Sequence, residues 1–360
     1  MPTWVRRFAV PVIVLGLVAA ACSKNNTSSG GGGSNGGTNC PSDYKVGLAL
    51  DVGGLGDKSF NDAANRGLQQ AVTDGLVCQS NTKLIESNAT GSNRDDNVQA
   101  LASAGYNLVE GVGFAFSPGV VKIAPQFPDV NFAVIDGYAT CGKACGLAAP
   151  SPNIADLTFK EQEGSYLVGI AAAMQAQKDG ANTVGFLGGQ TGPLIGKFQA
   201  GFTAGVLSVD PKMTVLVEYI GDSVTAFNDP TKGKALSEKM YGEGADVIYH
   251  ASGASGAGLF QAAAEKQKYA IGVDSDQYLT ASADQQPWIL TSMLKRVDTA
   301  TYNAIKQFKG GFQVFGLAEN GVDYSKSNTT LLTPDMIAAM NAAKQKIIDG
   351  SITVPDKPTA

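Results

Sequence analysis

The side chains best suited to binding chemistry cluster in a glycine-rich segment, LDVGGLGDKSFND (50–62). It carries two carboxylates, Asp51 and Asp57, beside Lys58 and Asn61. Its glycines resemble a phosphate-binding loop, but the G-K-[ST] ending is missing because Asp57 precedes Lys58. Two carboxylates would also repel a phosphate. We therefore predict a neutral, hydroxyl-rich ligand, with a tight connection that carries solvated acids as the alternative.

The rest of the chain offers few groups for catalysis or metal binding. It contains a single histidine, His250, and no G-x-S-x-G nucleophile turn follows any predicted strand. Cys141 and Cys145 are separated by three residues, which is not a usual zinc spacing. We predict that the protein is not an enzyme, needs no cofactor or metal, and uses His250 structurally. A cation held by Asp51 and Asp57, and with it an enzyme, is the alternative.

The segment at 50–62 needs a strand before it and a helix after it. The apolar run 46–50 predicts a buried strand. The three- and four-residue spacing of apolar side chains from Phe60 onward predicts a helix over 58–74. Asp51 would then stand at the carboxyl end of a parallel strand, where open α/β sheets bind their ligands.

Strands and helices alternate along the rest of the chain, which predicts parallel sheets covered by helices on both faces. The further predicted strands are 83–87, 107–112, 131–136, 155–159, 183–187, 214–219, 246–250, 269–273, 289–293 and 312–317. The further predicted helices are 92–104, 117–125, 160–178, 194–208, 231–242, 255–267, 297–309 and 334–349. These strands are too many for one comfortable sheet, so we predict two doubly wound α/β lobes.

Similar strand–turn–helix segments recur at LALDVGG near residue 48, VGFLGGQTG (184–192) and VIYHASGAS (247–255). Two similar lobes that face each other would place these turns around one cleft. Breaks in the pattern predict crossings between the lobes near 150–156, 275–288 and 317–322. The predicted N-terminal lobe is therefore 45–152 plus 278–317, and the predicted C-terminal lobe is 153–277 plus 318–352.

The N-terminus resembles a bacterial lipoprotein signal. Arg6 and Arg7 precede an apolar run that ends in small residues directly before Cys22. We predict a signal peptide at 1–21 and a lipidated Cys22, with an ordinary signal peptide cut after Ala21 as the alternative. Residues 22–44 are rich in Gly, Ser and Asn and predict a disordered tether. The protein is therefore predicted to be extracytoplasmic and lipid-anchored to the cell membrane.

Composition and cysteine number narrow the choice of partners. The net charge of −5 and the lack of a basic stripe argue against nucleic acid as a partner.

An even number of cysteines follows Cys22, which in an oxidising compartment predicts two disulfides with three possible connectivities. We favour Cys40–Cys78, which precede neighbouring strands, and Cys141–Cys145, which close a small loop.

Nine stretches together resemble the basic membrane protein family of substrate-binding lipoproteins. They are LDVGGLGDKSFND (50–62), EGVGFAFSP (110–118), NFAVIDG (131–137), FKEQEGSYLVG (159–169), VGFLGG (184–189), YIGDSVTAFNDP (219–230), GADVIYHASGASGAG (244–258), GVDSDQ (272–277) and LTSMLKRVD (290–298). The best-understood members are purine nucleoside receptors of ABC transporters. The resemblance implies a type I periplasmic-binding fold, in which two α/β lobes are joined by three crossings.

The resemblance also implies a ligand set. Phe60 and Phe227 match the positions of two rings that stack on the base. Asp136 matches a residue that hydrogen-bonds the base, and Asp274 and Lys295 match residues that hold the ribose. The remaining members of the implied set are Asp51, Asn61 and Gly253.

Two features qualify this ligand set. The helical spacing of Phe60 also fits a core position. Ala254 and Ser255, which follow Gly253, are bulkier than the glycine that the resemblance leads us to expect.

The partners implied by the resemblance are a nucleoside, an ABC permease and its ATPase, and the membrane through Cys22, with the protein as a monomer. The alternatives are a ligand sensor or regulator on the same fold, or a nucleoside-processing enzyme.

Overall fold

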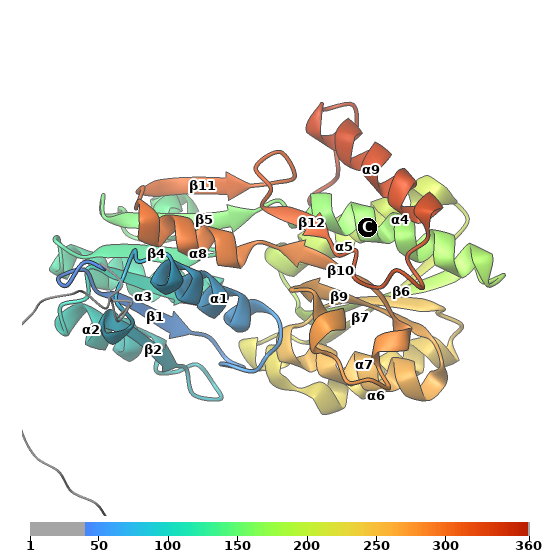
Figure 1. The fold of residues 1–360 in the computed structure, drawn as a ribbon, viewed down its shortest axis with the longest axis horizontal. Helices are drawn as coiled ribbons and strands as arrows, with labels where there is room; N and C mark the ends of the chain where they lie inside the picture. The colour runs from blue at the N-terminus through green and yellow to red at the C-terminus, as the bar shows by residue number, and fades with distance from the viewer. Residues whose placement is uncertain (1–39, 359–360) are drawn as a thin grey trace, which may run out of the picture. The chain divides into compact units, whose positions relative to one another are not determined.

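The computed structural model describes residues 40–358, which form two α/β lobes, each built on a six-stranded sheet (Figure 1). The predicted signal peptide, Cys22 and most of the predicted tether lie outside the described residues. Among the residues that are described, no helix has the length and apolar character needed to cross a bilayer.

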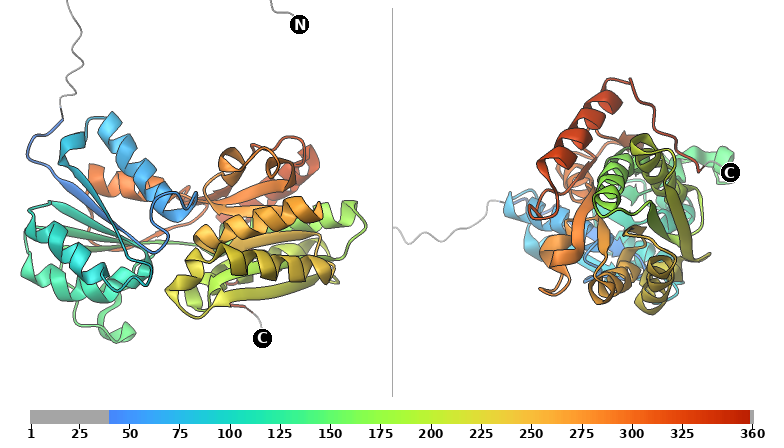
Figure 2. Two further views of the ribbon diagram at one scale, coloured as in Figure 1. Left: turned by 90° about the horizontal axis from the view of Figure 1, so that it is seen from below. Right: turned by 90° about the vertical axis from the view of Figure 1, so that its right-hand side faces the viewer.

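The first sheet is entirely parallel, with the order β2-β1-β3-β4-β5-β11. Its strands are β1 (Val46–Leu50), β2 (Thr82–Glu86), β3 (Leu108–Val112), β4 (Asn131–Ile135), β5 (Ile154–Phe159) and β11 (Gly311–Phe315). Two helices, α1 (Phe60–Thr73) and α8 (Val297–Lys306), pack together over one face. The other face is covered by α2 (Arg94–Ser103) and α3 (Ser117–Ile123) (Figure 2).

The second sheet repeats this order as β7-β6-β8-β9-β10, and β12 adds an antiparallel strand beside β10. Its strands are β6 (Thr183–Gln190), β7 (Thr214–Gly221), β8 (Val247–Ala251), β9 (Tyr269–Asp274), β10 (Ile289–Lys295) and β12 (Val322–Tyr324). The covering helices are α4 (Glu161–Lys178), α5 (Pro193–Val209), α6 (Pro230–Gly242), α7 (Gly256–Lys266) and α9 (Pro334–Ile348). The prediction of two parallel-sheet lobes is therefore confirmed.

Three crossings join the lobes and lie close to one another. The chain passes from β5 to α4 at Lys160, from β10 to α8 at Arg296, and from β11 to β12 through residues 316–321. The Lys160 N–H donates to the Phe315 carbonyl at 3.1 Å, and the Arg296 N–H donates to the Gly321 carbonyl at 2.8 Å. These bonds tie the crossings together into one hinge region.

The sheets assign two strands to the opposite lobe from the one that we predicted. The predicted C-terminal lobe (153–277) included β5, which pairs with β4 in the first sheet. The predicted N-terminal segment (278–317) included β10, which pairs with β9 in the second sheet. Pro152 and Pro287, which broke the pattern near these two predicted crossings, lie in the connections before β5 and β10, each within one lobe. The chain crosses instead directly from a strand into a helix. The third predicted crossing, 317–322, overlaps the observed connection.

The structure contains both favoured disulfides, Cys40–Cys78 and Cys141–Cys145, with Cα–Cα distances of 5.2 and 5.8 Å. We expect denatured, unreduced domain to bind no alkylating reagent at these four positions, because each sulfur is already in a disulfide. Peptide mass spectrometry after alkylation with and without reductant measures this. Alkylation of any of the four before reduction would contradict the pairing.

Candidate functional site

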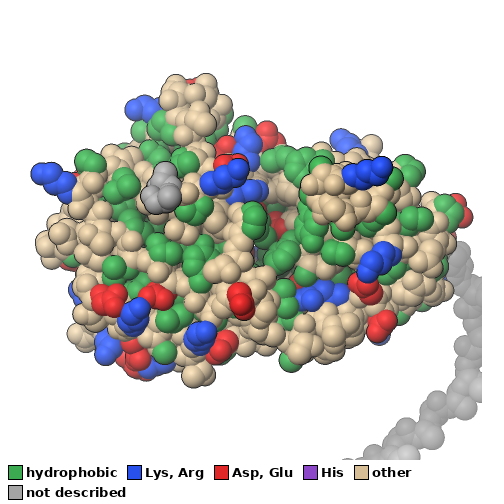
Figure 3. Space-filling view, turned by 180° about the vertical axis from the view of Figure 1, so that it is seen from behind, with side chains coloured by type: hydrophobic (Ala, Val, Ile, Leu, Met, Phe, Trp, Pro, Cys, Tyr) green, Lys and Arg blue, Asp and Glu red, His purple; other side chains and the backbone are tan. Residues whose placement is uncertain are grey.

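A cavity of about 660 Å³, including its opening, lies between the lobes at the carboxyl ends of the strands. The surface is hollowed between the two halves of the molecule (Figure 3). All eight ligand residues implied by the resemblance line this cavity, namely Asp51, Phe60, Asn61, Asp136, Phe227, Gly253, Asp274 and Lys295. In each sheet the first strand lies between the second and third, an order whose ligands bind at that switch point. The role of these eight residues in ligand binding stays a prediction.

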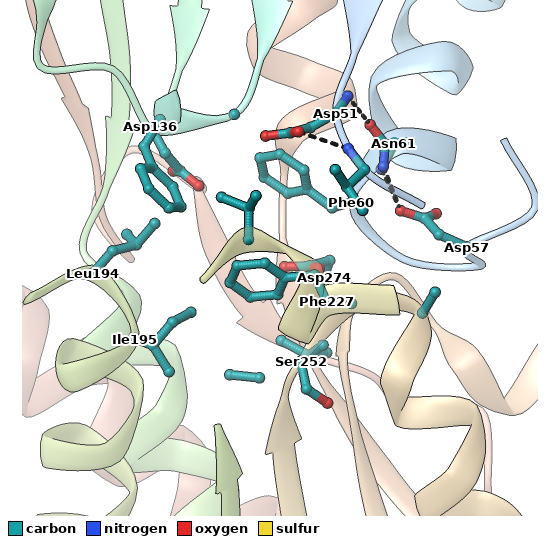
Figure 4. Close-up of a pocket in the computed structure, with 18 of the residues that line it drawn as sticks. Asp51, Asp57, Phe60, Asn61, Asp136, Leu194, Ile195, Phe227, Ser252 and Asp274 are labelled. Carbon is teal, nitrogen blue, oxygen red and sulfur yellow. Dashed lines mark hydrogen bonds between the residues drawn. The ribbon is translucent and has the colours of Figure 1, made fainter. Parts of the chain in front are cut away.

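Asp57 and Asn61 fix the loop after β1. The Asp57 carboxylate accepts the backbone N–H groups of Ser59, Asn61 and Asp62 at 2.8–3.1 Å, which caps the start of α1. The Asn61 amide donates to Asp57 at 3.0 Å and accepts the Asp51 N–H at 3.0 Å (Figure 4). A carboxylate therefore occupies the helix N-terminus that a phosphate would need, and the prediction of a ligand without phosphate stays a prediction.

Asp51 is paired with an arginine that we did not predict. Arg94, at the start of α2, donates from Nε to Asp51 Oδ1 at 2.8 Å and makes a second contact through Nη2. Burial raises the pKa of Asp51, and the Arg94 charge opposes that rise. Arg94 follows β2, whose carboxyl end adjoins that of β1, so strand order could have indicated it. Asp51 therefore keeps mainly Oδ2 for a ligand.

Asp136 and Asp274 occupy equivalent turns in the two lobes. Each stands at the end of the fourth strand of its own sheet, β4 or β9. Both have left-handed backbones, with φ values of +58° and +62°. Aspartate tolerates this conformation better than most side chains do, and such strain clusters at ligand sites. The turns bring both carboxylates to the cavity.

A buried cation at the hinge pairs with Asp136 and with a further carboxylate, Glu161. Lys295, at the end of β10, is 2% exposed, and its Nζ lies 2.7 Å from Asp136 Oδ2 and 3.0 Å from Glu161 Oε1. The rings of Phe60 and Phe159 have centroids 5.3 and 5.0 Å from the same nitrogen. Burial lowers the pKa of Lys295, but Asp136 and Glu161 reverse this effect and hold it above its ordinary value.

Two charged residues that we did not predict complete this cluster. Glu161, the first residue of α4, is fully buried. Its second oxygen lies 3.2 Å from Nζ of Lys197 on α5. Neither residue lines the cavity, and Lys197 is 30% exposed, so their types alone gave no signal.

Burial raises the pKa of both Asp136 and Asp274 to about 6, and the nearby Lys295 charge limits each rise. Asp136 Oδ1 is buried and accepts no hydrogen bond from any described residue. Such an atom is costly unless a ligand donates to it. Asp274 Oδ2 accepts the Ser59 hydroxyl at 2.5 Å.

Phe60 and Phe227 reach the cavity from opposite lobes (Figure 4). Phe60 opens α1, and Phe227 lies in the turn 224–228. Both are partly buried and also pack on the main core, so Phe60 serves the core and the cavity. Gly189 is required beside the second ring, because an added Cβ would lie 2.4 Å from it. Apolar side chains of α5 line the cavity beside the rings: Leu194, Ile195 and Phe198.

Ser255, one of the two residues bulkier than expected, supports the turn that carries Phe227. Its buried hydroxyl donates to the Ala226 carbonyl at 2.8 Å and accepts the Asp229 N–H at 2.7 Å. Gly253 precedes it with a φ of +55°, a conformation that favours glycine. The departure at Ser255 is therefore accommodated by hydrogen bonds outside the cavity lining, whereas Ala254 lines the cavity itself.

His250 is structural within the described fold. It is fully buried, and its two ring nitrogens lie 2.9 Å from Gln277 Oε1 and 3.1 Å from Ser252 Oγ. Burial lowers its pKa to about 4. Among residues 40–358, no group of three or more His, Cys, Asp or Glu side chains is placed to hold a metal ion.

Comparisons with known proteins agree with this architecture. A crystal structure of an ABC transporter solute-binding protein from Aeropyrum pernix is similar, with a TM-score of 0.72 and 27% identity, over 88% of this chain and 94% of that one. The ABC transporter nucleoside-binding protein BmpA of Lactococcus lactis is 32% identical over 336 residues, covering 88% of this chain and 90% of the relative. The CD4+ T-cell-stimulating antigen of Listeria innocua is 33% identical over 342 residues, with 88% and 89% covered.

Residues 44–358 match the family described as ABC transporter substrate-binding protein, PnrA-like, with the short name Bmp. The match confirms the resemblance to the basic membrane proteins. Proteins of this family bind a substrate and are not enzymes, which also confirms the prediction of a non-enzymatic protein. The chain belongs to the PnrA-like family of ABC transporter substrate-binding proteins.

Proposed function

We propose that the protein captures a nucleoside with a purine base in the cavity between its lobes and delivers it to an ABC importer. The observation that carries the proposal is the pair of rings, Phe60 and Phe227, that faces the cavity from opposite lobes beside several carboxylates. A flat base can be enclosed between two such rings, and stacking contributes roughly 1–3 kcal/mol per base.

The polar groups provide partners for the base and the sugar. The unpartnered Asp136 Oδ1 accepts an N–H of the base. Asp274 and Lys295 hold ribose hydroxyls, because the ammonium group has three donors and, among residues 40–358, two carboxylates lie within 3.0 Å of it. Asp51 Oδ2 accepts a further hydroxyl, and Asn61 and Asp57 keep the loop in place.

Substrate-binding proteins of ABC importers work outside the cytoplasm and hand their ligand to a permease and its ATPase. The Lactococcus lactis relative is a nucleoside-binding protein, which supports the choice of ligand. We further propose that the chain is a monomer held at the membrane by a lipid on Cys22.

Titration calorimetry with inosine, hypoxanthine and inosine monophosphate tests the proposal. We expect the nucleoside to bind most tightly, the free base less tightly and the nucleotide most weakly. The base leaves Asp274 and Lys295 without hydroxyl partners, which costs roughly 1–3 kcal/mol for each buried group. The nucleotide brings a phosphate next to a site where buried carboxylates outnumber cations, which adds Coulomb repulsion.

Two variants test which residue contacts the base and which contacts the sugar. Phe60→Ala is expected to weaken inosine and hypoxanthine about equally, because both contain the base. Asp274→Ala is expected to weaken inosine more than hypoxanthine, and exposed Asp284→Ala, as a control, to change neither. Tight binding of the nucleotide, or an Asp274→Ala protein with the wild-type preference for inosine, would overturn this assignment. Native mass spectrometry of the purified protein would identify another ligand class if inosine does not bind.

A further inference from the structure

Outside the cavity lining, a second set of polar contacts bridges the lobes. In the first lobe, Ser59 directly precedes α1 and Arg66 lies within that helix, and in the second lobe Ser275 follows β9. Arg66 Nη2 donates to Ser275 Oγ at 2.7 Å, and Ser275 Oγ donates to the Ser59 carbonyl at 2.9 Å. One hydroxyl is thus both acceptor and donor across the boundary between the lobes.

The same bridge reaches a proposed ligand residue. The Ser59 hydroxyl donates to Asp274 Oδ2 at 2.5 Å, and Asp274 directly precedes Ser275. Ser59 is fully buried, and Ser275 is 5% exposed. With Oδ2 occupied by the opposite lobe, Asp274 Oδ1 is the oxygen left for a sugar hydroxyl.

A nearby contact places the bridge at the rim of the cleft. Nζ of the exposed Lys58 donates to the carbonyl of the exposed Thr280 in the other lobe at 3.0 Å. The loop that contains Lys58 is itself fixed by Asp57, as described above. The first turn of α1 is therefore a rigid edge that meets the turn after β9.

We propose that Ser59, Arg66 and Ser275 are positioning residues for ligand binding, which orient Asp274 and hold the lobes closed around the ligand. The identity of the ligand rests on the proposed function, whereas the closing contacts do not. These residues act through Asp274 and through lobe closure and do not line the cavity themselves.

Lobe separation must break these hydrogen bonds, so their loss is expected to speed ligand release and leave capture unchanged. We expect Ser275→Ala to raise the dissociation rate constant of inosine about fivefold to tenfold, the factor that one or two net hydrogen bonds provide. The association rate constant is expected to stay at the wild-type value, because capture begins before the lobes meet. Stopped-flow or surface-plasmon measurements separate the two constants.

A double-mutant cycle distinguishes a specific bridge from general damage to the fold. Arg66→Gln is expected to raise the dissociation rate constant in wild type but to add little in the Ser275→Ala background, since its acceptor is already gone. Gln69→Ala, on an exposed part of α1, is the matched control and is expected to change neither constant. Fully additive effects of Arg66→Gln and Ser275→Ala would overturn the proposed bridge.

Ser59→Ala tests the link to Asp274. The variant is expected to weaken inosine more than hypoxanthine, because Asp274 serves the sugar and loses its orienting donor. Equal weakening of nucleoside and base would overturn this positioning role, since a structural defect affects both alike.

Closure can also be measured without ligand. Cysteines introduced as Lys58→Cys and Thr280→Cys, joined by a short bismaleimide, report how often the rims meet. We expect Ser275→Ala to slow this cross-linking about fivefold, in line with the loss of a net hydrogen bond. An unchanged rate would overturn the closing role even if inosine binds, whereas a slowed rate in a protein that does not bind inosine would refute only the proposed ligand.

Discussion

Lys295→Met is expected to abolish inosine binding and to lower the free energy of unfolding by about 3–5 kcal/mol, the usual cost of breaking a buried ion pair. The substitution keeps the approximate length of the side chain but removes the charge beside Asp136 and Glu161. Both carboxylates would stay buried without their central cation. Urea denaturation and calorimetry measure the two effects.

The matched control is Lys344→Met, whose partner Asp323 is partly exposed. A solvated pair of this kind contributes roughly 0–1 kcal/mol, so little stability should be lost. The deficit of the Lys295 variant should also shrink as pH falls through about 6, because Asp136 becomes neutral there in the wild type and already at higher pH in the variant, which lacks the Lys295 charge. Equal losses in the two variants, or a deficit that does not depend on pH, would refute the buried cluster as described.

Glu110→Gln is expected to stabilise the protein above neutral pH. Glu110 lies in the middle of β3, is fully buried, and accepts a hydrogen bond from Thr301 on α8 at 2.6 Å. Its other oxygen has no partner among the described residues. Burial raises the pKa of Glu110 from 4.5 to about 7, and the Thr301 bond opposes the rise only in part.

The sign follows from this raised pKa. The folded protein binds the Glu110 proton more tightly than the unfolded chain does. The contribution of protonated Glu110 to the free energy of unfolding is therefore fully present below about pH 4.5 and is lost as pH rises through about 7. The loss approaches roughly 3 kcal/mol at alkaline pH, at 1.36 kcal/mol per pKa unit. Glutamine stays neutral, so the stability difference between variant and wild type should grow from pH 5 to pH 8.5.

Chemical denaturation across this range tests the prediction, and the difference between the two proteins removes the contributions of Asp136 and Asp274. An exposed carboxylate, Asp349, provides the control as Asp349→Asn, which is expected to show no growing advantage above pH 5. A constant difference between wild type and Glu110→Gln would show that Glu110 does not titrate in the folded protein as proposed.

Local periodicity was sufficient to predict the order and type of nearly all elements in the described fold. Apolar runs and helical spacing are local properties, so strands such as β1 and helices such as α1 could be predicted without knowledge of the tertiary structure. The short β12, with three residues, has too little pattern to be recognised. The lobe crossings at Lys160 and Arg296 carry no proline or glycine that would mark them in the sequence. Which sheet a strand joins is decided by tertiary strand pairing, so these crossings could not be predicted from local patterns.

The residues that line the cavity could be predicted better than their partners. Asp51, Asp136 and Asp274 follow strands, so the rule that ligand sites form at carboxyl ends applies to each of them. Arg94, Glu161 and Ser59 reach their partners because of the direction in which their side chains point in the folded protein. Strand and helix patterns in the sequence do not determine that direction. We therefore predicted the carboxylates and Lys295 but missed the residues that pair with them, Arg94, Glu161 and Ser59.

The repeated strand order gives each lobe its own half of the cavity lining, with one ring and one aspartate at a left-handed turn. A nucleoside that first binds to the lining of one lobe is then held close to the lining of the other lobe, so the second contact forms within one complex. Effective concentrations for such intramolecular encounters reach the millimolar range, and the combined avidity can exceed either half by about 10²–10⁴. A molecule that matches only one half gains none of this advantage. Discrimination between ligands would therefore arise chiefly when the second half engages.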